Sequence, residues 1–230
     1  MEYTEKILLY FQSYIDLVQE PEKTRLISFY KTLPEEFYLY PAVSSENQSK
    51  IHLIKHGLMY AIYDGLIALR QFIRARPDIM QKHKDDADYK GTTPESDLIC
   101  AFLLHDCLKY KKNPSSINVF HDKDCASLCE QLGFNEVICE LVRYGHGQWS
   151  SSLSKEEPLA GITNSKYSDL IWLLHYADMV AAANDSLPLL EAPEPFDRSV
   201  FSKRRQAKFV DNTIDATWWE GKEVNDKQRN

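Results

Sequence analysis

An apolar run that leads directly into a histidine and an aspartate constrains this chain more than any other stretch. Residues 98–104 are all apolar, and His105 and Asp106 follow them at once. Such a run predicts a buried segment, and two ionisable groups buried behind it are costly unless a metal ion or a partner satisfies them. Lys109 follows Asp106 by three residues, one turn on a helix, so its ammonium group can reach the same place. We therefore expect a metal site at the end of this run.

The rest of the chain shows helical spacing of its apolar residues, and no segment alternates as a β-strand would. The sequence predicts helices over residues 4–19, 23–32, a stretch that ends at Arg76, about 94–111, 121–132, 135–145 and 167–185. The polar stretches 81–97 and 148–166 are predicted to be loops, with His83 on the surface of the first. No repeat or long linker divides the chain. We expect one all-α domain, a helical bundle with a subsidiary C-terminal segment.

Three regions are expected within that domain. Residues 1–49 form an N-terminal helical segment packed on the core, residues 50–185 form the metal-binding core, and residues 186–230 form a C-terminal extension. The composition, 43% hydrophobic and 27% charged over 230 residues, is typical of a folded protein. Five cysteines, an odd number, lie mostly in apolar helical patterns and are predicted to be reduced thiols.

The overall charge and the chain's start restrict partners and location. A net charge of −7 argues against binding duplex DNA, which normally requires a basic surface. A nucleotide or a single strand can still bind, because a divalent metal supplies local positive charge. The first residues are acidic without a signal peptide, and no apolar run approaches membrane-spanning length. We expect a cytoplasmic protein without a membrane partner; its oligomeric state stays open.

Four histidines and two aspartates could hold divalent ions together. The candidates are His56, His105, Asp106, His121, His146 and Asp178. Apart from the adjacent pair, each falls on a different expected helix or helix end, so a bundle could bring all of them together. Mixed nitrogen and oxygen donors favour Mn²⁺, Fe²⁺, Co²⁺, Ni²⁺ or Zn²⁺ over Mg²⁺, which prefers oxygen alone. This donor set is large enough for two ions.

Several of these residues have an alternative interpretation. His121 opens a polar stretch and could instead begin a surface helix. His146 lies between two glycines, whose backbone freedom a structural histidine does not need, and this favours a functional role. Asp178 lies on an apolar helix, where a solvated charge is hard to explain. His175, one turn earlier, could support a ligand from behind or be a core histidine.

The order of the six candidate ligands resembles that of the HD-domain superfamily of metal-dependent phosphohydrolases. The resemblance covers roughly residues 50–185 and implies an α-helical domain that hydrolyses phosphate esters. It implies a first metal ion on His56, His105, Asp106 and Asp178, and a second on Asp106, His121 and His146. Members with the two added histidines typically hold two metals, manganese among the candidates, and include phosphodiesterases and nucleases.

The resemblance also implies a mechanism. A hydroxide that bridges the metals attacks phosphorus, Asp106 and Lys109 act in catalysis, and Lys109 and Gln148 contact the substrate. Residues 146–152 and 173–179 are similar to HD-type 3′→5′ exoribonucleases, although Leu108 replaces a common glycine and no all-β segment supplies their OB-fold.

We expect a phosphodiesterase or nuclease that acts on single-stranded nucleic acid or nucleotide phosphodiesters. A nucleotide phosphomonoesterase and a non-catalytic module that binds a nucleotide or a protein are the alternatives.

Overall fold

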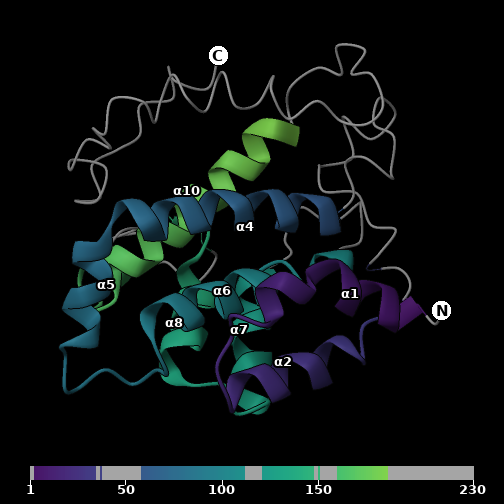
Figure 1. Ribbon diagram of the computed structural model, residues 1–230, viewed down its shortest axis with the longest axis horizontal. Coiled ribbons are helices and arrows are strands. Elements are labelled where there is room, and N and C mark those ends of the chain that lie inside the picture. The colour runs from purple at the N-terminus through teal and green to yellow at the C-terminus, as the bar shows by residue number, and fades with distance from the viewer. Residues whose placement is uncertain are drawn as a thin grey trace.

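The structure, a computed structural model, describes residues 3–34, 37, 58–111, 121–147, 150 and 160–185. These residues form helices joined by turns and contain no strand (Figure 1). The helices are α1 (Tyr3–Ile15), α2 (Glu22–Tyr30), α4 (Leu58–Ala75), α5 (Pro77–Lys84), α6 (Pro94–Leu104), the short 3-10 helix η2 (Lys109–Lys111), α7 (His121–Gln131), α8 (Glu136–Tyr144), α9 (Ala160–Thr163) and α10 (Ser168–Asp185). The expected all-α class is confirmed.

Two helices, α6 and α10, carry much of the core. Every residue of α6 except Glu95 is buried, and so is every residue of α10 from Leu170 to Ala177. Helix α4 packs along α10 and also contacts α6, while α8 lies between α6 and α7. Helices α1 and α2, the first two of the chain, both pack against α6 (Figure 1). Helices that are apolar all round are central ones, so the apolar runs mark the middle of the bundle.

A glycine allows α4 and α6 to approach closely. A Cβ atom added at Gly65 of α4 would lie 2.1 Å from Cζ of Phe102, which is fully buried on α6. No side chain larger than hydrogen fits there without moving the ring. The contact matters for the site, because the Phe102 carbonyl group lies 2.7 Å from a ring nitrogen of His105.

Helix α6 ends at Leu104, earlier than the sequence predicts. The carbonyl oxygens of its last turn accept hydrogen bonds from side chains: Phe102 O from His105 Nδ1 (2.7 Å), Leu103 O from the Tyr30 hydroxyl (2.7 Å) and Leu104 O from the Cys125 thiol (2.9 Å). Leu104 O also accepts from Cys107 N (2.9 Å), which closes a tighter turn in place of a further α-helical one. The prediction of one helix over 94–111 is therefore wrong. Asp106 lies in the turn that follows, which leads into η2.

The expected loop over residues 81–97 is also shorter than predicted. Pro77 begins α5 rather than only ending α4, because a proline at the first helical position has no N–H group to leave unsatisfied. His83 therefore lies on a helix, 2% exposed, and its Nε2 donates to Asp169 Oδ1 of α10 at 2.6 Å. The prediction of a surface position for His83 is wrong.

The remaining expectations agree with the structure to different degrees. Helices α7 and α8 are separated at Gly133 (φ +77°), as predicted, and α10 covers the expected range. Helix α1 ends earlier than residue 19, and α9 lies inside the predicted loop 148–166. The extension 186–230 lies outside the described residues. Among the helices described, none combines the length and the apolar character needed to cross a membrane.

Candidate metal centre

The end of α6 and the middle of α10 bring three of the expected ligands together. His105 and Asp106 are 1% and 3% exposed. His105 Nε2 lies 3.4 Å from Asp178 Oδ1 and 3.8 Å from Asp106 Oδ2. Since His105 Nδ1 donates to the Phe102 carbonyl group, the other ring nitrogen is the one that faces both carboxylates. Because α6 ends at Leu104, the Phe102 carbonyl group is available to orient the His105 ring in this way.

Helices α7 and α8 supply a second group around the same aspartate. His121 is the first residue of α7, and His146 follows the end of α8. Asp106 Oδ1 lies 3.0 Å from His121 Nε2 and 3.7 Å from His146 Nε2. The two Nε2 atoms are 2.8 Å apart. His121 is 9% exposed and faces Asp106, so the alternative of a surface helix start does not apply.

The two groups are continuous with each other. Each could hold a metal ion, because one ligand atom from each of its three residues lies within 4.8 Å of the others. Asp106 belongs to both, and His146 Nδ1 lies 3.2 Å from Asp178 Oδ2. We call the five residues His105, Asp106, His121, His146 and Asp178 the His/Asp cluster. Lys109 Nζ lies at its edge, 3.0 Å from Asp106 Oδ2.

Five of the six ligands expected from the sequence are thus close together in the described part of the chain. His56, the sixth, and Gln148, the expected substrate contact, lie outside the described residues.

The charges in the cluster keep its carboxylates ionised. Burial alone would raise the pKa of Asp106, but Lys109, His105 and His121 lower it well below the ordinary value. The pKa of Asp178 is lowered in the same way, against burial, by His105 and His146. Burial lowers the pKa of His105, and the Asp106 and Asp178 carboxylates outweigh this effect and raise it to about 9. One buried and one half-buried anion among imidazoles form an environment that favours cations.

One oxygen atom shows that the cluster fits a divalent cation. Asp106 Oδ1 is buried and accepts no hydrogen bond of acceptable geometry within the described residues. It faces the two histidine nitrogens named above, at 3.0 and 3.7 Å. Buried carboxylate oxygens are normally satisfied, and a cation satisfies such an oxygen without a proton. Imidazole nitrogens and carboxylate oxygens are ligands that Mn²⁺, Fe²⁺, Co²⁺, Ni²⁺ and Zn²⁺ accept.

A core histidine supports the turn that carries His146. His175 of α10 is 1% exposed and makes a hydrogen bond to the backbone of Gly145. A Cβ atom at Gly147 (φ +56°) would lie 2.7 Å from His175 Cδ2, so the turn needs glycine for both conformation and space. Burial lowers the pKa of His175 to about 4, and this ring is therefore neutral at pH 7. The two interpretations of His175 are compatible: it lies in the core and contacts the turn of a candidate ligand.

Asp122 and Ser150 are parts of the site that the sequence analysis did not find. Asp122, next to His121, is 2% exposed although it stands in a polar stretch. Ser150 donates from Oγ to Asp122 Oδ2 at 2.8 Å. This bond ties the start of α7 to the segment after Gly147, and so connects the two backbone regions that carry His121 and His146. Only the position of Asp122 beside a candidate ligand could have indicated its role.

Comparison of the chain with protein-family models, with curated proteins and with solved structures finds no match. A functional proposal therefore depends on the geometry of the His/Asp cluster and on the residues that form it.

Proposed function

We propose that this protein is a metal-dependent hydrolase of phosphate esters, with phosphodiesters as the favoured substrate class. The observation that carries the proposal is the pair of three-residue ligand groups that share Asp106. Two adjacent divalent ions are the usual apparatus for displacement at phosphorus in nucleases and phosphatases. The resemblance of the ligand order to the HD-domain superfamily supports the same reaction, and its members with the two added histidines include phosphodiesterases and nucleases.

The chain's own residues would have distinct tasks. His105, Asp106 and Asp178 would hold one ion, and Asp106, His121 and His146 the other. Divalent ions held there would supply Lewis acidity, which lowers the pKa of water and neutralises charge on phosphoryl oxygens. The hydrogen bond from His105 Nδ1 to the Phe102 carbonyl group fixes the ring orientation that ligation requires. His175 keeps the His146 turn in place from behind.

Lys109 is the residue best placed to bind the substrate's phosphate. Its side chain is 24% exposed, and its ammonium group lies 3.0 Å from Asp106 Oδ2. An ammonium group at the edge of the cluster can pair with a phosphoryl oxygen there and balance its charge. A lysine ammonium group donates hydrogen bonds and accepts none, which suits Lys109 to contact a phosphoryl oxygen.

A side-by-side hydrolysis assay tests the proposal. Full-length protein loaded with Mn²⁺ would be given a chromogenic phosphodiester and a chromogenic phosphomonoester, each with and without a chelator. We expect chelator-sensitive cleavage of the diester that falls at least a hundredfold in Asp178→Asn. Asp124→Asn, which changes an exposed carboxylate on α7, is the matched control and should keep full activity.

The same assay separates the alternatives. Hydrolysis of the monoester alone would refute the phosphodiesterase and favour a nucleotide phosphomonoesterase. No turnover of either ester by protein shown to contain metal would favour a non-catalytic binding module. A panel of single-stranded RNA, single-stranded DNA and common nucleotides then distinguishes a nuclease, which shortens the oligonucleotides, from an enzyme for small phosphodiesters.

A further inference from the structure

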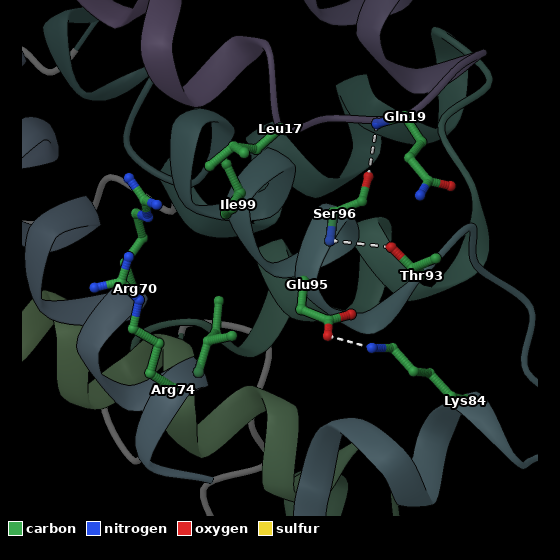
Figure 2. Close-up of a pocket in the computed structure, with 10 residues that line it drawn as sticks. Leu17, Gln19, Arg70, Arg74, Lys84, Thr93, Glu95, Ser96 and Ile99 are labelled. Atoms are coloured by element: carbon green, nitrogen blue, oxygen red, sulfur yellow. Dashed lines mark hydrogen bonds and ion pairs between the residues drawn. The ribbon is translucent and has the colours of Figure 1, made fainter. Parts of the chain in front are cut away.

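A cavity of about 350 Å³ lies at the start of α6, the opposite end of that helix from the His/Asp cluster (Figure 2). Its walls come from the segment after α1 and from α4, α5 and α6, and they are formed by Leu17, Gln19, Arg70, Ile73, Arg74, Lys84, Thr93, Glu95, Ser96 and Ile99. No residue of the cluster contributes to it. Helix α6 has 11 residues, about 16 Å at 1.5 Å per residue, so the two places are separate.

The side chains that line the cavity carry more positive than negative charges. Arg70 and Arg74 are four residues apart on α4, and Figure 2 shows them along one wall, across from Lys84 and Glu95. Lys84 Nζ is paired with Glu95 Oε1 at 2.5 Å. Neither arginine forms an ion pair with any residue that the structure describes; the Arg70 guanidinium lies 5.9 Å from the centre of the Tyr14 ring. Two guanidinium charges therefore border this cavity, neither of them paired with a carboxylate of the described residues, in a chain whose net charge is −7.

The rest of the lining suits a phosphate that is attached to a larger group. The hydroxyl groups of Thr93 and Ser96 lie where α6 begins, the end of a helix at which its dipole attracts anions. Guanidinium groups bind phosphate oxygens through paired hydrogen bonds. Ile73 and Ile99 add apolar surface beside these polar groups, as is usual in small-molecule sites.

We propose that this cavity binds a small phosphate-bearing anion, of the kind that a nucleotide presents, through Arg70 and Arg74. Glu95 is the group that opposes such a ligand, because its carboxylate faces the same space and occupies Lys84. The proposal is independent of the hydrolase function, since phosphate binding here requires neither a metal ion nor a reaction.

Titration of the full-length chain with pyrophosphate tests the proposal. Calorimetry would be performed on chelator-treated protein at constant ionic strength, so that metal in the His/Asp cluster does not contribute. We expect one binding event whose affinity falls about tenfold in Arg70→Gln and in Arg74→Gln, because each removes one charged contact. Lys31→Gln, which removes an exposed cation at the end of α2, is the matched control and should change the affinity less than twofold.

A variant that is expected to bind pyrophosphate more tightly distinguishes loss of a contact from misfolding. Glu95→Gln removes the opposing carboxylate and frees Lys84, and should tighten pyrophosphate binding several-fold. Circular dichroism would verify that each variant is folded. Absence of binding to the chelated protein, or equal weakening in Lys31→Gln, would overturn the proposal. So would weaker binding in Glu95→Gln. Binding that follows the arginines in a protein that hydrolyses nothing would support this site while refuting the hydrolase.

Discussion

His121 Nε2 and His146 Nε2 lie 2.8 Å apart, although one ring belongs to the start of α7 and the other to the turn after α8. At this distance both nitrogens cannot carry a proton, so one must present its lone pair to the other. Both also lie near Asp106 Oδ1, at 3.0 and 3.7 Å. Two imidazole nitrogens and an anionic oxygen that converge from separate parts of the chain could therefore hold a common cation.

Asp106 should decide whether the protein retains any metal. It is the residue common to both ligand groups, so Asp106→Asn is expected to lose both ions. His121→Ala removes a ligand from one group only and should leave one ion per chain. Metal content after dialysis, measured by elemental analysis, distinguishes the two cases, with Asp124→Asn as the control. Two ions retained by Asp106→Asn would refute the shared site.

Metal affinity should increase with pH across the neutral range. His105 keeps its second ring proton, and with it a positive charge, up to its raised pKa of about 9. Only the neutral ring can bind a metal ion. Metal binding near pH 7 must therefore displace that proton, and apparent affinity should rise by up to about tenfold per pH unit until the pKa is reached. Calorimetry with Mn²⁺ in two buffers of different ionisation enthalpy measures the released protons. Equal heats in both buffers would contradict the raised pKa.

Three residues of the His/Asp cluster could be predicted because they stand beside or within apolar runs. His105, Asp106 and Asp178 are conspicuous as ionisable residues next to such runs, and the runs form α6 and α10. The end of α6 could not be predicted, since the carbonyl groups that terminate it are satisfied by Tyr30 and Cys125 from distant parts of the chain. These partners depend on tertiary packing, which local sequence does not encode.

Burial of polar residues is the other feature that the sequence conceals. His83 stands in a polar stretch and yet is buried, because Asp169, 86 positions away, accepts its hydrogen bond. Asp122 is buried in the same way by Ser150. His83 has an exposed lysine on each side and Asp122 is followed by the exposed Lys123, so both sequence patterns indicate a surface. A hydrogen-bond partner from a distant part of the sequence offsets the free-energy cost of burying such a group.

Asp97 should be among the residues most important for stability. It is fully buried and accepts hydrogen bonds from the Tyr89 hydroxyl (2.8 Å), Thr92 N (2.9 Å) and Asn135 Nδ2 (3.0 Å), which join the segment before α6 to α8. Asp97→Ala leaves these half-buried donors, and the Thr92 hydroxyl (2.8 Å) with them, without that acceptor and should lower the free energy of unfolding by roughly 2–4 kcal/mol. Urea denaturation measures this. Asp88→Ala, at an exposed site, should change it by less than about 0.5 kcal/mol.

The contact between Gly65 and Phe102 should show strong coupling. Gly65→Ala places a methyl group where Phe102 Cζ lies 2.1 Å away, and the strain should cost about 1–3 kcal/mol of stability. Phe102→Leu alone should also destabilise, through lost packing. The double variant should be more stable than the sum of the two losses predicts, because the smaller side chain makes room for the methyl group. Additive losses in urea denaturation would show that the two helices adjust independently.

The pairing of Asp169 on α10 with Lys82 and His83 on α5 should make the free energy of unfolding depend on pH in the acid range. Burial would raise the pKa of Asp169, but His83 and Lys82 outweigh it and lower the pKa below the ordinary value. A carboxyl group whose pKa is lower in the folded state stabilises that state above its unfolded pKa of about 3.9, and the contribution disappears as the pH falls through the folded value. Asp169→Asn should therefore cost about 1 kcal/mol at pH 7 and progressively less below about pH 4. Urea denaturation of both proteins between pH 7 and pH 3 measures the difference, and a difference that stays constant across this range would show that the pairing does not lower the pKa.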